Sequence, residues 1–169
     1  HLKSILLDGF NVTVPYKETV VRYLDRLSPE AKILGAVNTV KKQANRWVGY
    51  NTDLYGFLKG MKEVGFSPKN KRAVVLGAGG SARSVVFGLA SSGIRNLAIF
   101  NRTPNRAKQL VNQFKRKFPK TYFSFHPMNQ SELKKVLSNS DLLVNATQVG
   151  LRPSDSPLVS GSVFPKKRI

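Results

Sequence analysis

Apolar residues follow two different rhythms along the chain, and the change falls in the polar, turn-rich segment 65–70. Ahead of that segment the apolar stretches are short, and their spacing alternates between strand-like and helix-like. The pattern predicts, in order, a strand at 9–14, a helix at 16–27, a short helix capped by Ser28, strands at 36–41 and 46–50 that form a hairpin, and a helix at 54–64. This first part is therefore expected to be a small unit of mixed helices and strands.

Beyond residue 70 the pattern becomes regular. Strands are predicted at 72–76, 96–100, 121–125 and 141–145, separated by helices at 81–92, 104–118 and 129–137. Strands that alternate with helices pair in parallel through right-handed crossovers, with helices on both faces of the sheet. The sequence therefore predicts an α/β fold in two domains, a smaller one at 1–67 and a doubly wound, Rossmann-type parallel sheet at 68–169.

Charge is the unusual feature of the composition. The 28 lysines and arginines outnumber the nine acidic residues and give a formal net charge of +19. Such an excess favours anionic partners, namely nucleic acid, anionic lipid or a phosphate-bearing small molecule. The basic residues fall in short separated clusters, at Lys41–Lys42, Lys69–Arg72, Lys115–Lys117 and Lys166–Arg168. Because they form no single stripe, the charge by itself predicts no nucleic-acid partner.

Several kinds of site and location are disfavoured by what the chain lacks. It has no cysteine, which excludes disulfides and thiolate zinc sites, and its two histidines are too few for a histidine-rich metal site. No apolar run approaches the roughly 18 residues that a membrane-spanning helix needs, and no leader-like segment opens the chain. We therefore expect no bound metal, no membrane association and a cytoplasmic location.

A glycine-rich turn joins the first strand of the second part to its helix. Residues 77–82, Gly-Ala-Gly-Gly-Ser-Ala, fit the dinucleotide-binding pattern G-x-G-x-x-G/A in the required strand–turn–helix context. The first glycine permits the sharp turn, the second lets the backbone approach a pyrophosphate, and N–H groups at the helix start face the phosphates. A tight turn without a ligand is the alternative. The candidate cofactor-binding residues here are Gly77, Ala78, Gly79, Gly80 and Ser81.

The segment after the second strand indicates which dinucleotide would bind. An NAD site normally carries an Asp or Glu there for the ribose hydroxyls, but residues 101–106, Asn-Arg-Thr-Pro-Asn-Arg, contain no carboxylate. Guanidinium groups bind a 2′-phosphate through charge-assisted hydrogen bonds. We therefore predict NADP, and for Arg106 plain surface charge is the alternative. The residues expected to hold this phosphate are Arg102 and Arg106, with Asn101 or Thr103.

Lys17 and Asp53 are the candidate catalytic residues of the first part. Lys17 falls in the first turn of the helix predicted at 16–27, where a cation opposes the helix dipole. It is interpreted either as an amine that exchanges protons or as a chance surface lysine. Asp53 is interpreted either as a helix N-cap or as a carboxylate that orients the ammonium group. Spacing along the chain does not show whether the two side chains meet.

Six motifs, in sequence order, resemble those of shikimate dehydrogenases. The first part carries Asn11–Lys17 (NVTVPYK), Gly35–Thr39 (GAVNT) and Gly49–Asp53 (GYNTD). The second part carries Gly77–Gly80 (GAGG), Asn101–Thr103 (NRT) and Asn145–Thr147 (NAT). The similarity runs from about residue 9 to residue 158, and the order of the motifs makes it highly specific.

This resemblance implies reversible, NADPH-dependent reduction of the ring ketone of 3-dehydroshikimate to shikimate, a step of aromatic amino acid and chorismate biosynthesis. It also implies that Lys17 and Asp53 form the catalytic pair beside the reacting oxygen, and that Thr13 and Asn38 bind substrate hydroxyls. For Asn145, a simple turn former is the alternative. The residues that the resemblance places beside the nicotinamide ribose are Asn145, Ala146 and Thr147.

Members of this family are longer at both ends. They carry a serine pair that grips the substrate carboxylate before the matching region, and closing helices after it, so we expect this chain to be a central portion with both domains incomplete. Gln148 also stands where the family often has serine. The expected partner is a small molecule, shikimate or 3-dehydroshikimate, and a homodimer is one option for assembly. The alternatives are a quinate/shikimate dehydrogenase of broader specificity, a noncatalytic basic nucleotide- or nucleic-acid-binding module, and an inactive fragment that binds only the cofactor.

Overall fold

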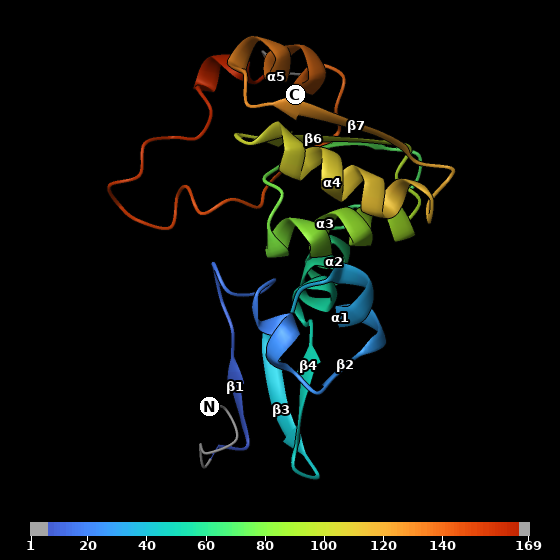
Figure 1. The fold of residues 1–169 in the computed structure, drawn as a ribbon. Coiled ribbons are helices and arrows are strands. Elements are labelled where there is room, and N and C mark those ends of the chain that lie inside the picture. The colour runs from blue at the N-terminus through green and yellow to red at the C-terminus, as the bar shows by residue number, and fades with distance from the viewer. Residues whose placement is uncertain (1–6, 166–169) are drawn as a thin grey trace.

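The computed structural model describes residues 7–165, which form two four-stranded sheets joined through packed helices. The two sheets lie at opposite ends of the molecule, and the helices α2 (Asp53–Glu63) and α3 (Gly80–Ser91) lie between them (Figure 1). The basic cluster Lys166–Arg168 and the terminal His1 fall outside the described residues.

The first sheet, here called the mixed sheet, has the order β1-β3-β4-β2. Its strands are β1 (Gly9–Asn11), β2 (Arg26–Leu27), β3 (Thr39–Gln43) and β4 (Arg46–Tyr50). The predicted hairpin is β3 and β4, which pair in antiparallel register around Gln43 and Arg46. The inward side chains of Val37, Val40 and Trp47 are buried in a small core of their own.

The helix predicted at 16–27 is wrong. Residues 14–19 form turns, Val20–Tyr23 a single 3-10 helix, and Arg26 and Leu27 an extended strand parallel to β4. The apolar side chains of this segment still pack against the mixed-sheet core. The pairing of this segment with β4 therefore determines its backbone conformation, although its local apolar spacing favours a helix. Lys17 consequently lies in a turn, so the dipole argument for a cation in a first helical turn does not apply to it.

The second sheet, the parallel sheet, confirms the predicted α/β rhythm. Its order is β7-β6-β5-β8 and every neighbouring pair is parallel. Its strands are β5 (Arg72–Leu76), β6 (Asn96–Asn101), β7 (Tyr122–Pro127) and β8 (Leu142–Asn145). The strand order reverses between β5 and β8, which is where ligands bind in open α/β sheets.

Helices cover both faces of the parallel sheet. Alternate strand residues such as Val75 and Ile99 face α3 and α4 (Pro104–Lys115) in the largest core. The residues between them, such as Leu76 and Phe100, face α5 (Gln130–Leu137) on the opposite side. This two-sided burial explains why these strands read as continuous apolar runs.

The largest core also crosses the segment at which the two predicted domains were divided. Leu34, from α1 (Pro29–Leu34), and Leu54 and Met61, from α2, are buried in one cluster with α3 and the parallel sheet. Gly88 of α3 lets α2 approach closely, since a Cβ there would lie 3.2 Å from Leu54 Cδ1. Val64, predicted on the buried face of its helix, is instead 79% exposed just after α2 ends. The domain boundary at residues 67–68 stays a prediction.

The start of α5 gives a first testable prediction. The Asn129 side chain accepts a hydrogen bond from the backbone N–H of Glu132 at 3.0 Å, and so caps a helix that covers one face of the parallel sheet. Replacing Asn129 by alanine is expected to lower the free energy of unfolding by about 1 kcal/mol, measured by urea denaturation. Thr103→Ala is the matched control because Thr103 caps α4 without a side-chain hydrogen bond. Equal losses in the two variants would contradict this account of capping.

Candidate active site

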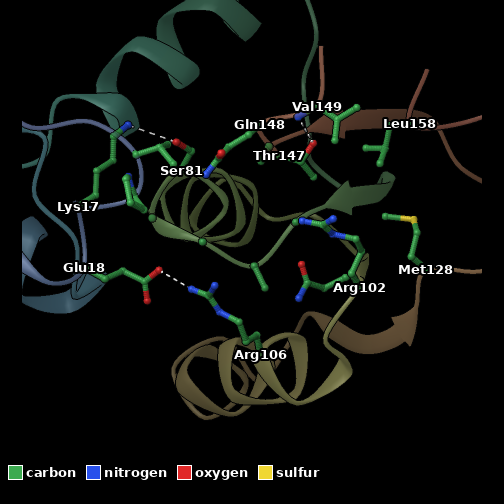
Figure 2. A pocket seen from close by; sticks show the side chains of 18 residues that line it. Lys17, Glu18, Ser81, Arg102, Arg106, Met128, Thr147, Gln148, Val149 and Leu158 are labelled. Atoms are coloured by element: carbon green, nitrogen blue, oxygen red, sulfur yellow. Dashed lines mark hydrogen bonds and ion pairs between the residues drawn. The ribbon is translucent and has the colours of Figure 1, made fainter. Parts of the chain in front are cut away.

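One cavity lies where the turn that carries Lys17 meets the carboxyl ends of the parallel strands (Figure 2). One wall comes from the first part of the chain and includes Val14, Lys17 and Glu18. The other walls come from the glycine-rich turn after β5, from the ends of β6 and β7, and from the segment after β8. The lining residues of those walls are Gly77, Ala78, Gly79, Gly80, Ser81, Asn101, Arg102, Arg106, Met128, Ala146, Thr147, Gln148, Val149 and Leu158.

The glycine-rich turn needs its small residues for two separate reasons. Gly77 has a φ of +109°, and a Cβ there would lie 2.9 Å from the Ala146 carbonyl oxygen at the end of β8. A Cβ on Gly80 would lie 2.8 Å from Lys17 Cβ. The first glycine thus lets the turn pass β8, and Gly80 lets the Lys17 turn sit against the start of α3.

Lys17 lies between the two sheets, with its ammonium group held by both sides. Its Nζ donates to Asp53 Oδ2 at 2.8 Å and to Ser81 Oγ at 3.2 Å. The Lys17 side chain is only 12% exposed, and its backbone oxygen accepts a hydrogen bond from the Val37 N–H. The structure therefore brings Lys17 and Asp53 together and sets their pair against the first turn of α3.

Asp53 is fixed from a second direction. Asn38 Nδ2 donates to Asp53 Oδ1 at 2.7 Å and to Thr52 Oγ1 at 2.9 Å, and the Thr52 N–H donates back to Asn38 Oδ1 at 2.9 Å. Asp53 is the first residue of α2, and the side chain that accepts from the helix start is that of Asn51, bonded to the Leu54 N–H. The Asp53 carboxylate is thus committed to Lys17 and Asn38 rather than to capping.

Residues 101–106, at the end of β6 and the start of α4, are here called the arginine segment. They lie across the cavity from Lys17. Arg102 is exposed and lines the cavity, and Asn101 Nδ2 donates to the Thr103 carbonyl oxygen at 2.9 Å. Figure 2 shows the Arg106 side chain extended toward Glu18, with Arg106 Nη2 2.9 Å from Glu18 Oε1. The two arginines expected to face one phosphate therefore differ in this structure, since Arg106 is already paired with a carboxylate.

The segment after β8 folds back on itself beside the cavity. Asn145 Oδ1 accepts from the Thr147 N–H at 3.0 Å and from Thr147 Oγ1 at 2.7 Å, and Asn145 Nδ2 donates to the Val149 carbonyl oxygen. These bonds hold the turn after β8 in shape, and Ala146 and Thr147 from that turn line the cavity.

The structure gathers most of the candidate residues but not all of them. In the part of the chain that the structure describes, five candidate residues do not line the cavity: Thr13, Asn38, Asp53, Thr103 and Asn145. Asp53 reaches the cavity through its contact with Lys17. Asn38 touches the site only through Asp53, and Thr13 is exposed after β1.

Glu18 was not predicted as a site residue, although it is one of nine acidic residues in a basic chain and follows Lys17 directly. That scarcity was a usable signal. Arg83 was not predicted either, and its partners come from three separate segments.

Asp155 holds the end of the segment that borders the cavity. Its Oδ2 accepts from the N–H groups of Gly150 at 2.8 Å and Arg152 at 3.1 Å. These backbone bonds, the one from Arg152 first, hold the pKa of the Asp155 carboxyl below its usual value.

The folded pKa of Asp155 is depressed, so its contribution to stability is complete above its unfolded pKa and is lost as pH falls through the folded value. Asn mimics the neutral acid. We expect the free energy of unfolding of the native chain to exceed that of Asp155→Asn above about pH 4, and the gap to close in more acidic solution. Urea unfolding at a series of pH values checks this, and a gap that widens toward acid would contradict it.

Two features are absent from residues 7–165. No group of three His, Cys, Asp or Glu side chains lies close enough together to hold a metal ion. None of the helices there has the length and apolar character required to cross a membrane.

Comparison with known proteins places this geometry in a family. Residues 1–40 match the family model for the shikimate dehydrogenase substrate binding domain, and residues 60–152 match the model for shikimate / quinate 5-dehydrogenase. The chain is 44% identical over 151 residues to the shikimate dehydrogenase (NADP(+)) of Geobacter metallireducens, which covers 89% of this chain and 53% of that protein. The chain therefore spans about half the length of the curated relatives it matches.

Solved structures agree with these matches. The shikimate 5-dehydrogenase of Thermus thermophilus, in complex with NADP(H) and shikimate, has a TM-score of 0.76 and 40% identity, over 97% of this chain and 57% of that one. The quinate dehydrogenase of Corynebacterium glutamicum, in complex with NAD, has a TM-score of 0.79 and 31% identity, over 94% and 56%. From the family match over residues 60–152, the shared fold and these identities, we conclude that the chain belongs to the shikimate/quinate dehydrogenase family.

Proposed function

We propose that the protein catalyses the reversible, NADPH-dependent reduction of 3-dehydroshikimate to shikimate. The observation that carries this proposal is the position of the Lys17 ammonium group. It lies 2.8 Å from Asp53 Oδ2 and 3.2 Å from Ser81 Oγ, beside the glycine-rich turn. A proton-carrying side chain thus faces the place where a dinucleotide would bind. The curated relative from Geobacter metallireducens carries the name of this activity.

The residues at the cavity fit an NADP cofactor. Gly77, with its positive φ, and the backbone at the start of α3 form a cradle for a pyrophosphate. Arg102, together with Asn101 and Thr103 in the same segment, would hold the adenosine 2′-phosphate, with Arg106 nearby. Asn145, Ala146 and Thr147 would border the nicotinamide ribose. When bound, the reduced cofactor supplies a hydride to the ketone carbon.

Lys17 would supply the proton in the same reaction. As the ketone carbon gains the hydride, its oxygen becomes an alkoxide, which takes a proton from the Lys17 ammonium group and leaves a neutral amine. Asp53 would keep the ammonium group in place through their 2.8 Å contact, and Asn38 would hold Asp53 through its 2.7 Å hydrogen bond. In the reverse direction, the neutral amine would accept the hydroxyl proton of shikimate.

The substrate side of the site is proposed from the family resemblance. Thr13 is exposed on the segment after β1 and would donate to or accept from a substrate hydroxyl. Asn38 would contact a hydroxyl beside Asp53. The cytoplasmic location, the homodimeric assembly and the two domains at 1–67 and 68–169 also remain proposals.

A dehydrogenase of broader specificity, acting on quinate as well as shikimate, is the second candidate function. One observation favours it. The family model that matches residues 60–152 is described as shikimate / quinate 5-dehydrogenase, and the quinate dehydrogenase of Corynebacterium glutamicum shares the fold at 31% identity.

One assay on the full-length protein distinguishes the two candidate functions. Formation of NADPH or NADH is followed by absorbance with shikimate, with quinate or with no substrate. The first candidate predicts turnover of shikimate with NADP and little with quinate or NAD. Comparable turnover of quinate would favour the second, and no turnover of either substrate would refute both.

A further inference from the structure

Glu18 joins the two halves of the molecule at the edge of the cavity. Its Oε2 lies 2.9 Å from Arg83 Nη2, on α3, and its Oε1 lies 2.9 Å from Arg106 Nη2, on α4. Glu18 itself belongs to the turn that carries Lys17. These three side chains, here called the Glu18 cluster, lie beside the glycine-rich turn, because a Cβ on Gly79 would be 3.9 Å from Glu18 Oε1.

The two arginines of the Glu18 cluster are held very differently. Arg83 is 19% exposed, and its Nη1 also donates to the Leu34 carbonyl oxygen and to the Gln113 side chain. Arg106 is 54% exposed, and it contacts Glu18 across the edge of the cavity. Arg83 is therefore the fixed partner of the carboxylate, and Arg106 is the partner that can exchange.

The charges of the cluster leave room for an anion. One carboxylate faces two guanidinium groups, so one positive charge is left over. If Arg106 turned toward a phosphate, Glu18 would keep Arg83 as its counter-ion, and no buried charge would be left unpaired. A phosphate also offers a guanidinium group more acceptor oxygens and more charge than a carboxylate does.

We propose that Glu18 is a positioning residue that holds Arg106 until the 2′-phosphate of the dinucleotide takes the place of the carboxylate. This inference rests on the proposed function, because it assumes that the cavity binds a 2′-phosphorylated dinucleotide. Binding of the phosphate would break the contact between the Lys17 turn and α4, while the contact between that turn and α3 through Arg83 would remain. Glu18 therefore acts against the affinity for the 2′-phosphate, and it does so through Arg106.

Nucleotide fragments test this competition without turnover. Calorimetry on the full-length protein measures the dissociation constants of two nucleotides. Adenosine 2′,5′-bisphosphate carries the 2′-phosphate, and ADP lacks it. We expect Glu18→Gln to bind the bisphosphate about twofold to tenfold more tightly and to bind ADP unchanged. We expect no such gain when Glu18→Gln is added to Arg106→Ala. Equal or weaker bisphosphate binding by Glu18→Gln, or a gain that survives without Arg106, would overturn the inference.

Glu63→Gln is the matched control, because it removes the same charge from an exposed pair, Lys59–Glu63, on α2. A gain of the same size in Glu63→Gln would reduce the effect to net charge and overturn the inference. If Glu18→Gln does not fold, the native protein answers the question by carbon NMR. The Glu18 carboxyl resonance should move with the bisphosphate and not with ADP, and an unmoved resonance would overturn the inference.

The same experiment separates this inference from the proposed function. A protein that shows the expected Glu18 effect but oxidises neither shikimate nor quinate would leave the inference standing and refute the function. A protein that oxidises shikimate but lacks the Glu18 effect would do the reverse. If neither nucleotide binds, the inference falls together with the cofactor assignment.

Discussion

Replacing Lys17 by alanine is expected to lower turnover of shikimate by about a hundredfold to ten-thousandfold, which is the usual contribution of a general acid–base group. The physical reason is that Asp53 and Ser81 hold the ammonium group of Lys17, which lines the cavity. Its removal leaves water as the proton donor. The dissociation constant for NADP should change little, because the phosphates would be bound by the glycine-rich turn and the arginine segment.

Asp53→Asn tests the other half of the pair. The amide keeps the shape of the carboxylate but loses the charge that orients the ammonium group. We therefore expect a large loss of turnover, but a smaller one than in Lys17→Ala. Lys59→Ala is the matched control, because Lys59 is 79% exposed on the same helix as Asp53. Steady-state rates and calorimetric affinities for NADP are measured for all three variants. Unchanged turnover in Lys17→Ala would refute the proposed mechanism.

Replacing Arg102 by alanine is expected to weaken NADP binding about tenfold to a hundredfold, the effect of losing one or two charged hydrogen bonds. Arg102 is exposed, lines the cavity and follows β6 directly, where a dinucleotide ribose lies in a Rossmann-type sheet. NAD lacks the 2′-phosphate, so its affinity should change little. The ratio of the two dissociation constants is therefore the quantity to measure.

Arg116→Ala is the control for Arg102, because Arg116 is an exposed arginine at the opposite end of the following helix. It removes the same charge far from the cavity, and both dissociation constants should stay close to those of the native protein. Equal weakening of NADP and NAD by Arg102→Ala would refute the assignment of this residue to the 2′-phosphate.

The parallel sheet could be predicted from the sequence because its signals are local. Each strand there is a short apolar run, and a recognisable residue marks a helix boundary, such as Pro104 at the start of α4 or Gly93 shortly after the end of α3. The glycine-rich turn was found for the same reason, since its residue types are dictated by backbone conformation at Gly77. These features survive folding because the tertiary contacts reinforce the local preferences.

The mixed sheet was harder to predict because distant pairing shapes it. Apolar residues at Val20, Val21 and Leu24 have helical spacing, yet β2 pairs with β4, and the Asp25 side chain accepts from the Trp47 N–H. The sequence of residues 16–27 does not by itself indicate that this segment pairs with β4. Val64 was misplaced similarly, since the helix ends one residue before it.

The site was predicted as a set of residues but not as a set of contacts. The contact between Lys17 and Asp53 joins residues 36 apart in sequence, and the contact between Glu18 and Arg106 joins residues 88 apart. Motif spacing carries no information at that range. The pairing of Arg106 with a carboxylate could therefore be learned only from the fold.

Chemical rescue of Lys17→Ala tests most directly whether Lys17 carries the proton. Small primary amines are added to the variant with saturating NADP and shikimate, and the rate is followed against amine concentration and basicity. We expect the rate to rise with added amine in Lys17→Ala, and not to rise in Asp53→Asn, which retains its own amine. A Lys17→Ala rate that no amine changes, with both ligands still bound, would contradict this expectation.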